Sequence, residues 1–169
     1  MLKLQYDETT GVVGKAYPEA YDVATPYIEI DEATNDKIAA DAENIYFVVN
    51  NELTTTPTDG YKNKTRLAEI DKELTQADVT YQTVLNTPVK YTNGYTYLPS
   101  YVDSYALLIA SGVSPLTIWD STELNSVSMT TAELTALSTF LKDIAEPAFQ
   151  TRKTTRKALL TEKATLITT

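Results

Sequence analysis

Paired acidic residues are the first candidates for chemistry in this chain. Two carboxylates held at a fixed separation across a cleft can hydrolyse a glycosidic bond, and clustered carboxylates can bind Ca²⁺. One sequence does not fix such a separation, and the EF-hand calcium pattern is absent. The alternative, solvated surface charge, is the interpretation that the sequence favours. The pairs are Asp7/Glu8, Asp31/Glu32 and Asp71/Glu73.

The composition excludes most other catalytic groups. The chain has no Cys and no His, so thiolate nucleophiles, histidine general bases and Cys/His zinc clusters are impossible. Its 5 glycines form neither a P-loop nor a dinucleotide fingerprint. We therefore expect a protein that is not an enzyme and that has no catalytic residue, no cofactor and no metal site.

A tyrosine-rich hairpin over residues 89–98 is the most clearly predicted element. Asn93-Gly94 is typical of a type I′ turn, which would pair Thr92 with Tyr95 and extend to a Val89–Leu98 pair. That register places Tyr95 and Tyr97 on the outer face. There they could cover a neighbouring helix, contact another subunit, or bind a saccharide or other receptor.

A long helix is predicted from Lys62 to about Leu85. Its apolar positions are spaced 3, 4, 3, 4 and 3 residues apart, which is a heptad seam. The seam either packs within its own domain or associates with another copy. It consists of Leu67, Ile70, Leu74, Ala77, Tyr81 and Val84.

The net charge of −9 is unevenly distributed. Residues 1–59 contain three Lys against twelve Asp and Glu, whereas residues 148–169 contain five Lys and Arg, including Arg152 and Arg156, against one Glu. Five basic residues on one terminal helix are a poor nucleic-acid site, so we expect attraction between neighbouring protein surfaces instead. No apolar run approaches the roughly 20 residues of a membrane helix, and we expect no membrane insertion.

The fold class predicted is α+β, with a small antiparallel β segment followed by a mainly helical domain. Residues 1–59 form the acidic β-rich segment, and residues 60–169 form the helical domain with hairpin 89–98. Trp119 is expected in the core, and Thr130 to Glu133 match a capping box. Pro147 is expected to interrupt the helix that follows, with a final helix starting at about Ala148.

The order of hairpin, short helix, tryptophan segment and paired terminal helices over residues 62–167 resembles a domain of unknown function found in bacteriophage tail-associated proteins. The resemblance implies a virion structural or adaptor protein of a tail fibre or baseplate, made in the host cytoplasm and located in the phage tail. A tail-fibre assembly chaperone is the alternative, and a receptor-binding module is third. Other tail proteins would be its partners, and a homo-oligomer, with a trimer favoured, is implied. No functional residue is transferred.

Overall fold

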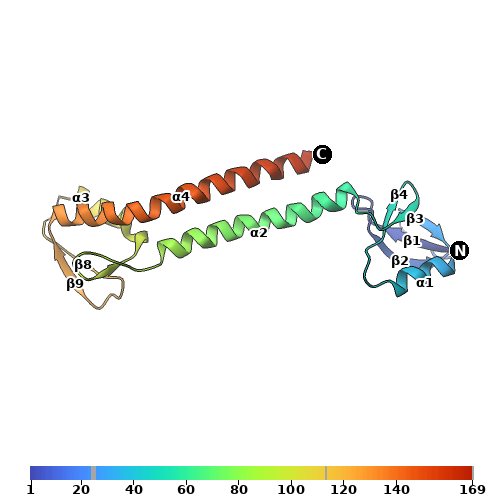
Figure 1. The fold of residues 1–169 in the computed structure, drawn as a ribbon, viewed down its shortest axis with the longest axis horizontal. Coiled ribbons are helices and arrows are strands. Elements are labelled where there is room, and N and C mark those ends of the chain that lie inside the picture. Colours follow the sequence, from blue (N-terminus) through green and yellow to red (C-terminus); the bar gives the residue numbers. More distant parts are fainter. Residues whose placement is uncertain (24–25, 113, 169) are drawn as a thin grey trace. The chain divides into compact units, whose positions relative to one another are not determined.

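The computed structural model describes residues 1–23, 26–112 and 114–168, and it has an α+β fold (Figure 1). Internal contacts divide the chain into two compact units, residues 1–70 and 71–169. The sequence predicted a boundary at residues 59–60, but the contacts place the division eleven residues later, within a helix. We describe each unit by itself.

The N-terminal unit is built on a three-stranded antiparallel sheet of order β2-β1-β3. Leu4 on the central strand packs against Ile28, Ile30 and Val48, which form the core of this unit. Helix α1 and a second hairpin follow the sheet, and Asn50 and Asn51 adopt positive φ in that hairpin's turn, as their type predicts. The elements are β1 (Leu2–Tyr6), β2 (Val13–Pro18), β3 (Tyr27–Ile30), α1 (Glu32–Ala40), β4 (Phe47–Val49) and β5 (Glu52–Thr54).

Helix α2 (Asp59–Leu85) begins against the loop between β1 and β2. The Thr58 hydroxyl donates to the Thr10 carbonyl at 2.5 Å and accepts a hydrogen bond from the Tyr61 amide at 3.1 Å. A Cβ on Gly60 would lie 1.9 Å from the Thr9 carbonyl oxygen, so only glycine permits this approach. The first turns of α2 therefore belong to the N-terminal unit.

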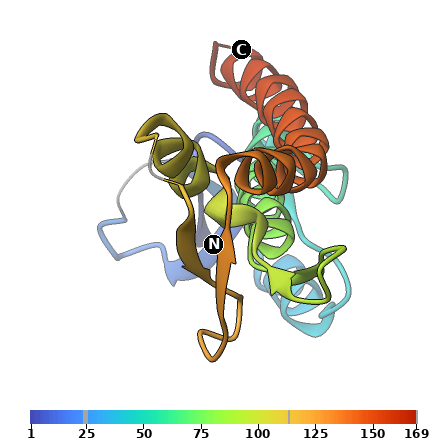
Figure 2. The same ribbon diagram turned by 90° about the vertical axis from the view of Figure 1, so that its left-hand side faces the viewer.

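The C-terminal unit packs two hairpins and a short helix around the start of a long helix (Figure 2). Its elements are β6 (Val89–Lys90), β7 (Thr96–Tyr97), η1 (Pro99–Tyr101), α3 (Val102–Ala110), β8 (Leu116–Trp119), β9 (Ser126–Met129) and α4 (Thr131–Thr168). The buried core consists of Tyr97, Tyr105, Ile118, Met129, Leu134, Leu137 and Leu141.

The predicted register of hairpin 89–98 is wrong by one residue. The structure pairs Val89 with Tyr97, and the Tyr91 amide donates to the Tyr95 carbonyl, leaving a loop of three residues. Gly94 alone adopts positive φ (91°) there, which is the three-residue turn with a glycine bulge and not type I′. A shift of one residue exchanges the faces of a strand, so Tyr97 is fully buried instead of exposed.

The predicted burial of Trp119 is also wrong, because its side chain is 55% exposed. Strand β8 pairs with β9 in the register Leu116 to Met129 and Ile118 to Val127, and these four residues face the core. Alternation along the strand then turns Trp119 outward, opposite Ser126.

The capping box at the start of α4 is confirmed. The Thr130 amide donates to the Glu133 carboxylate at 2.7 Å, and the Glu133 amide donates to the Thr130 hydroxyl at 3.3 Å. The predicted interruption at Pro147 is wrong, because α4 continues through it. Proline removes one backbone donor and crowds the preceding turn, and the helix packs on either side of it, with Leu141 in the core and Phe149 against Tyr81.

Candidate interaction site on the α2–α4 helix pair

The two long helices lie side by side and antiparallel over residues 71–85 of α2 and the second half of α4 (Figure 1). Leu74, Ala77, Tyr81 and Val84 of the predicted seam are all half-buried there. From α4, Arg152, Arg156, Leu159, Lys163 and Leu166 recur at spacings of four and three, so one side of each helix faces the other.

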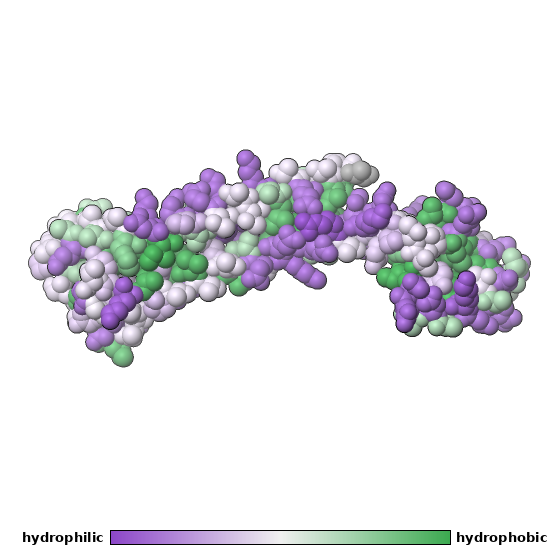
Figure 3. All heavy atoms as spheres, viewed as in Figure 1, coloured by the Kyte–Doolittle hydropathy of each residue, from purple (hydrophilic) through white to green (hydrophobic). Residues whose placement is uncertain are grey.

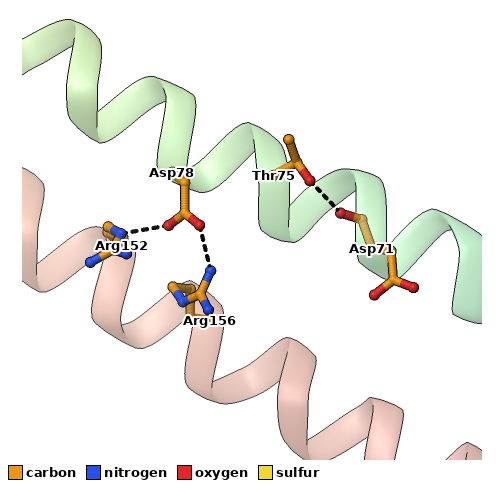
Figure 4. Close-up of polar contacts among 5 residues, drawn as sticks. All are labelled: Asp71, Thr75, Asp78, Arg152 and Arg156. Carbon is orange, nitrogen blue, oxygen red and sulfur yellow. Dashed lines mark hydrogen bonds and ion pairs between the residues drawn. The ribbon is translucent and has the colours of Figure 1, made fainter.

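Asp78 is the centre of the polar contacts between these helices (Figure 4). One carboxylate oxygen accepts from Arg152 Nε at 2.6 Å, and the other accepts from Arg156 Nη1 at 2.7 Å. The hydrogen bond from Arg152, together with the charges of both arginines, holds the pKa of Asp78 below its usual value of 3.8. Arg152 and Arg156, predicted as interface residues, are thus bound within the chain.

Aromatic contacts and a second ion pair extend the same interface. The Tyr81 and Phe149 rings lie 6.1 Å apart, and the Arg152 guanidinium lies over the Tyr81 ring at 5.3 Å from its centroid. Lys163 donates to Asp71 at 2.5 Å. The helix pair is therefore joined by charge and by aromatic rings more than by an aliphatic seam.

A shallow trough of about 980 Å³ runs along α4 from Phe149 to Thr168, and Arg152 and Arg156, which bind Asp78, are among its lining residues. Its exposed apolar side chains include Phe149 and Leu160, and Ile167 is exposed beyond them. Lys153 and Lys157 line the trough, and neither makes an ion pair with any residue that the structure describes. Hydrophobic residues accordingly interrupt the hydrophilic surface along the helix pair (Figure 3).

A second hollow of about 490 Å³ lies between the two helices on another side. Ala77, Tyr81 and Val84 line it from α2, and Ala148 and Thr155 line it from α4. The predicted seam is thus covered on one side by α4 and open on another. A pair of helices buries only part of each apolar stripe, which is why these side chains stay half-buried.

The structure gives the eight predicted interface residues different environments. Ile70 and Tyr97 have no exposed surface, so neither can contact a partner in this conformation. Leu67, Leu74 and Tyr81 are half-buried, Tyr95 is 37% exposed, and Arg152 and Arg156 bind Asp78. The helix pair brings together Leu74, Tyr81, Arg152 and Arg156, but not the hairpin tyrosines.

The predicted interface residues did not include Asp78, Phe149, Lys153 or Lys157, although the two lysines belong to the basic cluster of the terminal helix. Asp78 directly follows the seam residue Ala77, and pairing it with Arg152 requires knowing that the two helices are antiparallel. Phe149, Lys153 and Leu160 share a face of one helix, and this signal was present in the spacing.

Each acidic pair includes a carboxylate that stabilises the fold. Asp7 accepts from the Thr10 amide and hydroxyl, and Asp31 caps α1 by accepting from the Thr34 amide. Asp71 binds Lys163. Within the described residues, no group of His, Cys, Asp or Glu is arranged to hold a metal ion. No helix in the described part of the chain is long and apolar enough to span a membrane.

Comparison with known proteins gives no relative. No family model matches the chain, and neither a curated protein nor a solved structure matches it.

Proposed function

We propose that this protein is a structural or adaptor subunit of a bacteriophage tail, in a fibre or baseplate, and that it acts through protein–protein contacts. The observation that supports contact is the trough on α4, where apolar side chains and unpaired lysines are exposed together. Interfaces combine an apolar centre with charged groups at the rim, and this trough has both. The tail assignment rests on the sequence resemblance over residues 62–167.

The partner surface is acidic. Lys153 and Lys157 are two of the five basic residues in residues 148–169, against one acidic residue, whereas residues 1–59 of the same chain have three basic against twelve acidic residues. Opposite potentials steer association and fix which surfaces meet. A second copy of this chain satisfies this requirement, and so does an acidic neighbouring tail protein. The first would give a homo-oligomer, for which the resemblance to tail proteins favours a trimer.

A tail-fibre assembly chaperone is the second candidate, because the same trough could hold a segment of an unfinished fibre. The location of the protein distinguishes the two. Mass spectrometry of purified particles, calibrated against a major tail protein, should find this chain at a fixed stoichiometry. Presence in the lysate of infected cells but not in particles would support the chaperone and overturn the structural role. A receptor-binding module remains third.

A further inference from the structure

A hollow of about 660 Å³ lies between α3 and the β8–β9 hairpin, outside the helix pair. Figure 2 shows α3 beside strand β8 at this place. Its size is within the range of sites that bind small ligands, which is about 300–1,000 Å³. The lining residues are Tyr101, Ser104, Tyr105 and Leu108 from the helical side, with Thr117, Ile118, Trp119 and Glu123 from the hairpin side.

The single tryptophan of the chain lines this hollow and stays 55% exposed. An indole gains more than any other side chain from burial, so its exposure beside a hollow is a feature that the fold alone does not require. The other outward positions of the hairpin are small and polar, namely Thr117, Ser126 and Ser128. Trp119 therefore presents an uncovered aromatic face.

Two packed tyrosine rings line the hollow together with Trp119. Tyr105 is 4% exposed, and its ring packs edge-on against Tyr101, with centroids 5.9 Å apart, and against Tyr97 at 6.4 Å. The Tyr105 hydroxyl is buried without a hydrogen-bond partner among the described residues. A buried hydroxyl without a partner is unfavourable.

The turn after Trp119 places the acidic residue Glu123 at the same hollow. Buried Asp120 accepts hydrogen bonds from the Thr122 hydroxyl at 2.5 Å and from Asn125 Nδ2 at 2.8 Å, which fixes the turn. Glu123 adopts φ of 59°, a conformation that is unfavourable for a residue with a Cβ. The Glu123 amide donates to the Asp120 carbonyl at 3.0 Å, so this conformation belongs to the hairpin turn, and the turn places Glu123 at the hollow.

We propose that this hollow binds a neutral saccharide, with one sugar ring stacked on Trp119 and ring hydroxyls donating to the Glu123 carboxylate. The C–H face of a sugar is apolar and matches the indole, and its hydroxyls both donate and accept, matching Glu123, Ser104 and Thr117.

Other ligand classes fit the lining less well. Among the described residues that line the hollow there is no Lys or Arg, and Glu123 would repel a phosphate or a carboxylate. An apolar ligand would leave Glu123 and two hydroxyls without partners. An organic cation suits the rings and the carboxylate but not Ser104 and Thr117. Hydrolysis is not expected, because the other nearby carboxylate, Asp120, is buried and already hydrogen-bonded within its own turn.

The test is a screen of the full-length protein against an array of neutral oligosaccharides, followed by titration calorimetry with the best binders. Quenching of the single tryptophan on saccharide addition gives an independent readout. We expect Trp119→Ala and Glu123→Gln each to weaken binding by about tenfold or more, the effect of losing one stacking contact or one charge-assisted hydrogen bond. Leu124→Ala, in the same turn but 82% exposed and outside the hollow, is the matched control and should bind normally.

Three results would overturn the proposal. They are an array without a binder, unchanged saccharide affinity in Trp119→Ala, and a response to choline that exceeds the response to every saccharide. Circular dichroism of each variant confirms that it folds, which is expected because both substituted side chains lie at the surface and outside the core.

Discussion

Gly60 is the residue at which helix preference and packing oppose each other most directly. Alanine is favoured over glycine inside a helix by up to about 1 kcal/mol. A Cβ at this position, however, would lie 1.9 Å from the Thr9 carbonyl oxygen, and a backbone atom cannot move away as a flexible side chain would.

We therefore predict that Gly60→Ala destabilises the protein by about 1–3 kcal/mol, the range for overpacking, although it improves helix propensity. Thr65→Ala, an exposed position on the same helix, is the control and should be neutral or slightly stabilising. Urea denaturation followed by circular dichroism measures both. Equal or greater stability of Gly60→Ala would show that the start of α2 does not lie this close to the Thr9 carbonyl.

Single residues also show why the sequence predicted some side chains and not others. Leu134, Leu137 and Leu141 are buried, and this was predictable because spacings of three and four residues place them on one side of a helix. The burial of Tyr97 and Trp119 depends on the geometry of a turn and on which face of a hairpin meets the core. A register change of one residue reverses which side chains of a strand are buried. In the hairpin that contains Tyr97, Gly94 alone adopts positive φ, whereas the predicted type I′ turn would need positive φ at both Asn93 and Gly94.

At the scale of elements, Asp78 joins α2 to α4 and should make their pairing depend on pH. Its pKa in the folded protein lies below the unfolded value of about 3.9, since both arginines stabilise the charged form. Such a group contributes stability above the unfolded pKa and loses that contribution as the pH falls through the folded pKa.

We predict that Asp78→Asn lowers the free energy of unfolding at pH 7 only slightly, because the Asp78 side chain is 41% exposed and solvent screens the ion pair. The difference between the variant and the unsubstituted protein should vanish below the folded pKa. Asp143→Asn, exposed on α4, controls for loss of one negative charge and should have a smaller effect. Denaturation curves at several pH values decide it, and a difference that persists at the lowest pH would contradict the ion-pair explanation.

Pro147 tests whether α4 is one helix. The proline is exposed and lies inside a helix of 38 residues, where it removes one backbone hydrogen bond. Pro147→Ala should stabilise the protein by about 1–3 kcal/mol, the upper value being the full penalty for proline within a helix. Thermal unfolding measures the change. A neutral or destabilising result would indicate two helices separated at Pro147, as the sequence alone suggested.

Elements with a strong local signal were predictable, whereas their pairing was not. The capping box of α4, the asparagine turn of β4–β5 and the extent of α2 all follow from neighbouring residues. The partner of the α2 seam does not, since spacings alone fit both a second copy and α4. The ion pairs from Asp78 to Arg152 and Arg156 show that α4 is the partner of this part of α2.

At the scale of the whole molecule, the uneven charge and the trough on α4 favour association. Exposed charges are screened beyond roughly 8–10 Å at physiological ionic strength, so attraction between the acidic N-terminal residues of one copy and the α4 lysines of another should weaken with added salt. An apolar contribution from Leu160 and Phe149 would instead persist, because burial of apolar surface does not depend on screening.

We predict that the purified protein self-associates, that association weakens as salt is raised, and that Leu160→Glu weakens it further. Leu160 is 48% exposed and lines the trough, so the substitution should disturb contact but not the fold. Thr154→Glu adds the same charge to an exposed position of α4 outside the trough and is the matched control. Light scattering across protein concentration and salt gives the mass of the assembly, with a trimer favoured. A monomer under every condition, or equal behaviour of the two variants, would show that the trough is not a surface for self-association and would leave an acidic neighbouring protein as the proposed partner.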